Sequence, residues 1–125
     1  MVEARFDGVC ELVLQARDLE GMVSFYAGIG LPALSREGDR VWLDAGGRCR
    51  IGIWTPGEKE HEDRGGSHVH FALSVAPGRL EAIAERFGET GWAFEGPIEH
   101  DGGDRSIYLF DPAGNRLELW DYFQR

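Results

Sequence analysis

The chain has 125 residues, a formal net charge of -9 at pH 7 and a sequence pI near 4.8. This length suits a single domain with one core, and an acidic surface repels phosphate backbones and anionic membranes. No apolar run approaches the roughly 20 residues that span a bilayer, and residues 1–5 lack the apolar core of a secretory signal. We therefore expect a cytoplasmic protein with neither a nucleic acid nor a membrane as its partner.

The first half of the chain predicts one β-α-β-β-β unit. Residues 11–16 alternate in character as a strand does, and Asp18 is placed to cap a helix over residues 19–27. That helix is expected to end in the glycine-rich residues 28–30. Three short strands separated by turns follow, at residues 33–36, 40–44 and 48–54.

The same order of elements recurs in the second half. After a polar stretch at residues 55–66, which we interpret as a linker, a strand is predicted at residues 68–75 and a helix at residues 80–87. Three more strands are expected at residues 94–99, 105–110 and 116–122. The second copy is longer by about seven residues, which are placed most simply in the loop around residues 100–103.

The predicted fold class is therefore α+β, with two βαβββ modules in one domain over residues 1–125. Module 1 covers about residues 8–54 and module 2 about residues 67–123. Together they are expected to form a curved mixed sheet shaped as a cup, with the helices on its outer face.

Strand alternation sorts the side chains of each sheet onto two faces. One face is apolar and is expected to pack under the helices; it holds Leu12, Leu14, Ala16, Val41, Leu43, Ile51, Ile53, Val69, Phe71, Leu73, Val75, Ile107, Leu109, Leu117 and Leu119. The opposite face mixes charged with aromatic side chains, which is typical of a ligand cup, although a solvated face or a dimer contact is the alternative. The residues expected to contact a small-molecule substrate are Trp42, Arg50, Trp54, Phe110, Arg116 and Trp120.

A metal site is predicted on this second face. Glu11 and His70 occupy equivalent positions of the two repeats, and Glu118 lies on the last strand of the second. Equivalent positions converge near a pseudo-twofold axis, and one imidazole with two carboxylates is a plausible ligand set for a divalent ion. Tyr108 and His68 are candidate catalytic residues for hydrogen bonding or proton transfer. Plain polar surface is the alternative for the three candidate ligands, and a structural role is the alternative for Tyr108 and His68.

Three segments resemble the vicinal oxygen chelate superfamily of glyoxalases, bleomycin-resistance proteins and extradiol dioxygenases. They are the Asp18-Leu19 pair with its following Phe25-Tyr26, the HFALSV run at residues 70–75, and the YLFDPAGNRLEL run at residues 108–119. The resemblance covers nearly the whole chain. It indicates the fold more specifically than it indicates a reaction.

The resemblance implies that His70 and Glu118 bind a divalent ion, with Glu11 standing where metal-dependent members have a first His. A carboxylate there favours harder ions, so that Mn, Fe(II), Ni and Mg are as plausible as Zn. Gly52 occupies the position of a fourth ligand in glyoxalases. The implied activity is that of a metal-dependent lyase, thiol transferase or dioxygenase that captures two neighbouring substrate oxygens.

A second interpretation is a metal-free binder, similar to bleomycin-resistance proteins, that sequesters an aromatic drug or metabolite. Four Trp residues in an acidic chain suit a cationic aromatic ligand. The metal-dependent enzyme is the preferred interpretation. Each module forms half a cup, so the copies either close on each other or pair with copies in a second chain, and the resemblance implies a homodimer.

Overall fold

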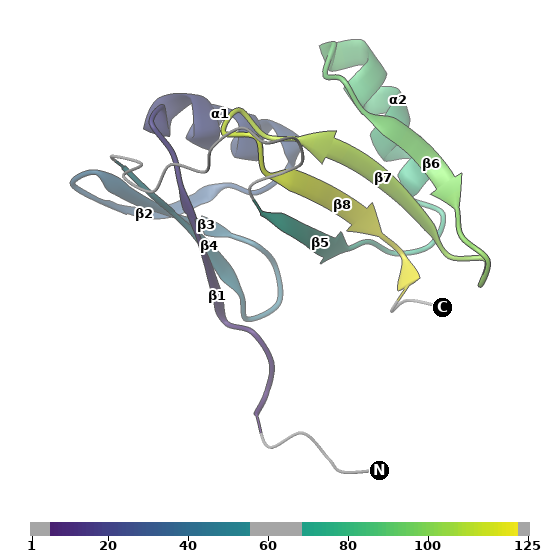
Figure 1. Cartoon of the computed structure of the whole chain (residues 1–125), viewed down its shortest axis with the longest axis horizontal. Coiled ribbons are helices and arrows are strands. Elements are labelled where there is room, and N and C mark those ends of the chain that lie inside the picture. Colours follow the sequence, from purple (N-terminus) through teal and green to yellow (C-terminus); the bar gives the residue numbers. More distant parts are fainter. Residues whose placement is uncertain (1–5, 56–68, 123–125) are drawn as a thin grey trace. The chain divides into compact units, whose positions relative to one another are not determined.

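The computed structural model describes residues 6–55 and 69–122 (Figure 1). The chain divides into two compact units, Met1–Glu60 and His61–Arg125, and each unit contains one βαβββ module. The predicted α+β class and the two modules are confirmed. The single domain stays a prediction.

Module 1 contains one helix and a four-stranded mixed sheet. Its elements are β1 (Glu11–Gln15), α1 (Leu19–Ile29), β2 (Ala33–Glu37), β3 (Arg40–Asp44) and β4 (Arg50–Trp54). The strand order is β1-β4-β3-β2, with β1 parallel to β4 and the other pairs antiparallel. Glu11 lies opposite Arg50 and Trp42 opposite Gly52, so their side chains share one face of the sheet.

The ends of α1 follow from its sequence. Asp18 Oδ1 accepts a hydrogen bond from the Gly21 N–H at 2.9 Å, which satisfies one of the free donors of the first turn. Gly30 has a φ of 112° and donates to the Tyr26 and Ala27 carbonyls, which ends the helix. The helix therefore runs two residues beyond the predicted end, because Gly28 continues the helical backbone and Gly30 is the residue that leaves it.

Module 2 repeats this arrangement. Its elements are β5 (His70–Ser74), α2 (Leu80–Thr90), β6 (Glu95–Glu99), β7 (Arg105–Phe110) and β8 (Arg116–Trp120), in the strand order β5-β8-β7-β6. Tyr108 lies opposite Glu118, and Ser106 lies opposite Trp120. The turn between β7 and β8 is closed by Asp111, whose Oδ1 accepts from the backbone of Ala113 and Asn115 at 2.9 Å each. The conspicuous DPAGN run is thus a structural feature.

The apolar face of each sheet forms the core, as the alternation predicts. In each module the helix packs against the sheet, α1 mainly against β3 and β4, and α2 mainly against β6 and β7. Buried strand residues on these faces are Leu14, Val41, Leu43, Ile51, Ile53, Ile107, Leu109, Leu117 and Leu119. The opposite face of each sheet, which we call the polar face, is therefore turned away from the helix of its own module.

Two predictions fall on the part of the chain outside the described residues. These are the linker at residues 55–66, of which only Thr55 is described, and the candidate catalytic residue His68. Among the described residues, no helix has the length and apolar character needed to cross a membrane.

Candidate functional site

Glu118 is the centre of a polar network on the polar face of module 2. It lies in the middle of β8 and is only 8% exposed, although its neighbours Leu117 and Leu119 point into the core. A buried carboxylate is costly unless hydrogen bonds compensate for its lost hydration. The surrounding strands supply those hydrogen bonds.

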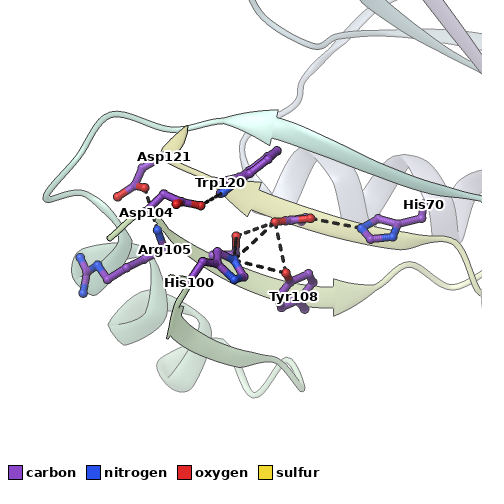
Figure 2. A network of polar contacts seen from close by, with 9 residues as sticks. His70, His100, Asp104, Arg105, Tyr108, Trp120 and Asp121 are labelled. Atoms are coloured by element: carbon purple, nitrogen blue, oxygen red, sulfur yellow. Dashed lines mark hydrogen bonds and ion pairs between the residues drawn. The ribbon is translucent and has the colours of Figure 1, made fainter. Parts of the chain in front are cut away.

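The two oxygens of Glu118 have different partners. Oε1 lies 3.2 Å from His70 Nε2 of β5. Oε2 accepts hydrogen bonds from Ser106 Oγ at 2.5 Å and from Tyr108 OH at 3.2 Å, both on β7. Figure 2 shows His70 at one end of this network, apart from Tyr108 and His100, which lie close together. One oxygen is thus held by hydroxyl groups, while the other faces an imidazole.

His100 extends the network beyond the strands. Its Nε2 lies 2.9 Å from Ser106 Oγ, 3.5 Å from Tyr108 OH and 3.9 Å from Glu118 Oε2. Ser106 donates its only hydroxyl proton to Glu118, so its oxygen must accept from His100, and Nε2 therefore carries a hydrogen. His100 is fixed by a tight turn in which its carbonyl accepts from Gly103 and its N–H donates to Asp104.

Sequence reasoning missed both His100 and Ser106 as site residues. His100 comes from the loop that makes module 2 longer than module 1, and this extra length was the available signal. Ser106 lies two residues before Tyr108 on β7, so alternation alone places it on the polar face.

Tyr108 is a neutral hydrogen-bond donor at ordinary pH. Burial is the main cause that raises the pKa of its phenol, and the nearby charge of Glu118 and the hydrogen bond to it act in the same direction. The candidate catalytic residue Tyr108 therefore contacts Glu118 directly in its protonated form.

The other predicted contact residues of module 2 lie around this network. The Arg116 guanidinium lies 4.5 Å from the centre of the Tyr108 ring and 5.9 Å from that of Phe110. Trp120 Nε1 donates to Asp104 Oδ2 at 2.6 Å, and the Phe110 side chain is exposed. Aromatic and cationic surface thus adjoins the carboxylate, as a site for a small polar ligand requires.

Module 1 has a different arrangement at the equivalent positions. Glu11 Oε1 accepts from Trp42 Nε1 and from Arg50 Nε, each at 2.9 Å. A Cβ atom added at Gly52, the counterpart of Glu118, would lie 3.1 Å from Trp54 Nε1 and 3.3 Å from Trp42 Nε1. Two indoles therefore occupy the space into which the side chain of a fourth ligand would project.

The His70–Glu118 pair fits two ligands of a divalent ion. Ligand bonds of about 2.0–2.2 Å at right angles place the donor atoms about 3 Å apart. His70 Nε2 and Glu118 Oε1, at 3.2 Å, have this spacing, and the hydroxyls on Oε2 are the outer hydrogen bonds that metal-bound carboxylates receive. Within residues 6–55 and 69–122, no three His, Cys, Asp or Glu side chains gather into a metal-binding group. His70 and Glu118 therefore account for two of the ligands that a divalent ion needs.

A family model described as the Glyoxalase/Bleomycin resistance protein/Dioxygenase superfamily matches residues 8–119. The chain belongs to this superfamily. Divalent metal ions and small-molecule ligands are commonly bound by its members. No curated protein matches the sequence of this superfamily member.

Solved structures show the same fold. Lactoylglutathione lyase from Agrobacterium tumefaciens is 23% identical over 94% of this chain and 96% of its own, with a TM-score of 0.75. A glyoxalase/dioxygenase from Nostoc punctiforme is 19% identical over 97% of this chain and 96% of its own, with a TM-score of 0.78. The bleomycin resistance determinant encoded on transposon Tn5 is 18% identical over 89% of this chain and 94% of its own, with a TM-score of 0.71. At these identities the similarity shows the fold alone.

Proposed function

We propose that this superfamily member is a divalent-metal-dependent enzyme that acts on a small molecule through two neighbouring substrate oxygens. The observation that supports the proposal best is the His70–Glu118 pair, with its 3.2 Å spacing and its second carboxylate oxygen held by Ser106 and Tyr108. A carboxylate that served only as polar surface would have no need of this burial.

In this proposal His70, Glu118 and Glu11 hold the ion. The Oε1 atom of Glu11 is engaged by Trp42 and Arg50, which keeps the carboxylate in a fixed orientation for a ligand at Oε2. When bound, a Mn, Fe(II), Ni, Zn or Mg ion supplies a positive charge that stabilises negative charge developing on substrate oxygens.

The chain's own side chains bind and orient the substrate. Tyr108, kept protonated by burial, donates its one hydroxyl proton to Glu118 and so helps to hold that carboxylate, and His68 is proposed to transfer a proton. Arg50 and Arg116 would bind an anionic group. The aromatic residues proposed to cover the substrate and exclude water are Trp42, Trp54, Phe110 and Trp120. We also propose that the enzyme is a homodimer, which its molar mass in solution would test.

The test is elemental analysis of protein purified without chelators, together with the His70→Gln and Glu118→Gln variants. Both variants keep a side chain of similar size but weaken metal binding. We expect about one equivalent of a transition metal in the wild type, and clearly less bound metal in each variant because its affinity falls by about tenfold or more. Glu85→Gln, at an exposed position of α2, is the matched control and should keep its metal. Metal content unchanged in both site variants would contradict the proposed ligands.

A metal-free binding protein is the second candidate, and the indoles over Gly52 favour it. They place aromatic surface where a carboxylate would otherwise stand, and Glu11 beside them suits a cationic aromatic ligand. Titration of metal-depleted protein with such compounds, followed by Trp fluorescence, would test it. Micromolar binding that Trp42→Phe weakens, in a protein that takes up no ion on reconstitution, would favour the binder over the enzyme.

A further inference from the structure

The two oxygens of the Glu118 carboxylate have different hydrogen-bond partners, and this difference affects which size of metal ion the carboxylate can bind. Its Oε2 accepts from two hydroxyl groups, those of Ser106 and Tyr108, and so has no lone pair left for another partner. Its Oε1 contacts only His70 among the described residues. An ion beside His70 can therefore reach one oxygen of this carboxylate and not both.

The two hydroxyls are held in place by further contacts. Ser106 is fully buried, and its oxygen accepts from His100, which leaves the Ser106 proton directed at Glu118. Tyr108 is fixed from its other side by Arg116, which lies over its ring at 4.5 Å. Rotating Glu118 to offer both oxygens would break the short bond to Ser106 inside a buried region, where an unsatisfied hydroxyl is costly.

The other candidate carboxylate is restricted in the same way. Glu11 has Oε1 held by the Trp42 indole and the Arg50 guanidinium, at 2.9 Å each, and among the described residues no hydrogen bond engages its Oε2. The two modules use different donors for this purpose, hydroxyls in one and an indole with a guanidinium in the other. The shared result is a carboxylate limited to one ligand oxygen.

Ions differ in what they require from a carboxylate. Ca²⁺ takes six to eight oxygen ligands, and carboxylates often bind it with both oxygens at about 2.3–2.6 Å. Zn²⁺ and Mg²⁺ bind at about 2.0–2.2 Å with fewer or stricter ligand positions. The pair of one imidazole nitrogen, from His70, and one carboxylate oxygen, from Glu118, therefore suits the smaller ions.

We propose that Ser106 and Tyr108, positioned by His100, restrict Glu118 to one-oxygen coordination and thereby make the site select small divalent ions against Ca²⁺. This inference rests on the proposed metal-dependent function. Ser106, Tyr108 and His100 act here as positioning residues.

The experiment is calorimetric titration of the metal-depleted protein with Mn²⁺, Zn²⁺ and Ca²⁺ in turn. The variants are Ser106→Ala, which removes the donor at 2.5 Å, and Tyr108→Phe, which removes a single oxygen and should fold like the wild type. We expect the wild type to prefer Mn²⁺ and Zn²⁺, and each variant to lose about 10-fold or more of this preference over Ca²⁺. His100→Ala should lose less, since it acts through Ser106.

Tyr122→Phe is the matched control, because it removes a phenol hydroxyl from a residue that stacks on Trp120 and leaves the contacts of Glu118 intact.

The absorption spectrum of the Co²⁺-substituted protein gives a second readout. Coordination by a second Glu118 oxygen in Ser106→Ala should weaken the visible bands of the ion. If the wild type binds Mn²⁺ or Zn²⁺ and the folded variants keep the same preference for these ions over Ca²⁺, this inference is overturned and the proposed function stands. A wild type that binds none of the ions would overturn both.

Discussion

The polar faces of the two modules have the same strand register but carry different side chains at equivalent positions. In module 1, Trp42 lies opposite Gly52 and Arg40 opposite Trp54; in module 2, Tyr108 lies opposite Glu118 and Ser106 opposite Trp120. An indole lies opposite the residue without a side chain, whereas a phenol lies opposite the carboxylate, which also accepts a hydrogen bond from a serine hydroxyl. The backbone repeat therefore sets where side chains point, and the choice of residue at each position sets the chemistry.

The largest expected difference between the modules concerns Glu118. Glu118→Ala leaves the hydroxyls of Ser106 and Tyr108 and the imidazole of His70 without their shared partner. We expect the free energy of unfolding of the metal-free protein to fall by about 3 kcal/mol, measured by urea denaturation. Glu118→Gln keeps an acceptor oxygen and should lose less. Equal losses in the two variants would show that the hydrogen bonds contribute little.

The converse change is made at Gly52. A Cβ at this position meets both indoles at 3.1–3.3 Å, and the Trp42 indole resists displacement because it is hydrogen-bonded to Glu11. We expect Gly52→Ala to lower the free energy of unfolding by about 2 kcal/mol through overpacking. Gly88→Ala on α2, where an added Cβ meets nothing within 4 Å, is the control and should gain about 0.5–1 kcal/mol. If the double variant Gly52→Ala/Trp42→Tyr regains stability, the destabilisation in Gly52→Ala comes from the clash with the Trp42 indole. If the double variant stays equally destabilised, that clash is not the cause.

Equivalent tryptophans provide a finer comparison. Trp120 Nε1 donates to the buried Asp104 at 2.6 Å, whereas the buried Trp54 Nε1 has no hydrogen-bond partner among the described residues. Trp120→Phe should therefore destabilise the protein by about 1.5 kcal/mol more than Trp54→Phe, because it leaves a carboxylate unpaired. Chemical denaturation of the two variants measures the difference. A larger loss in Trp54→Phe would contradict this account.

The smallest expected effect is a pH dependence of the contact between α2 and β7. A hydrogen bond from Arg105 is the main cause that lowers the pKa of Glu81 below its ordinary value of 4.5. A lowered pKa in the folded state stabilises the protein above that ordinary value, and this contribution is lost as the pH falls through the folded-state pKa. Arg105→Gln should flatten the stability profile slightly below pH 4.5. Because the pair is exposed, high salt should reduce the effect in the wild type.

Much of the fold could be predicted because strand alternation and glycine turns are local signals. Alternation placed Leu14, Ile51 and Leu117 in the core and Glu118 on the opposite face, and the structure confirms these placements. The same reasoning named His70 and Glu118 as candidates, and the structure brings them together. Their role as ligands, with Glu11, stays a prediction.

The sequence by itself determined the repeat, the elements and the face on which each strand residue lies, because these depend on periods of two and 3.6 residues along the chain. Only the tertiary structure showed that His100 reaches Ser106, that Ser106 holds one oxygen of Glu118, and that two indoles cover Gly52. Most of these contacts join residues on different strands and loops, so they depend on how side chains of given length fill the space above the sheet. The sequence pattern records on which face a side chain lies, and packing decides what it touches.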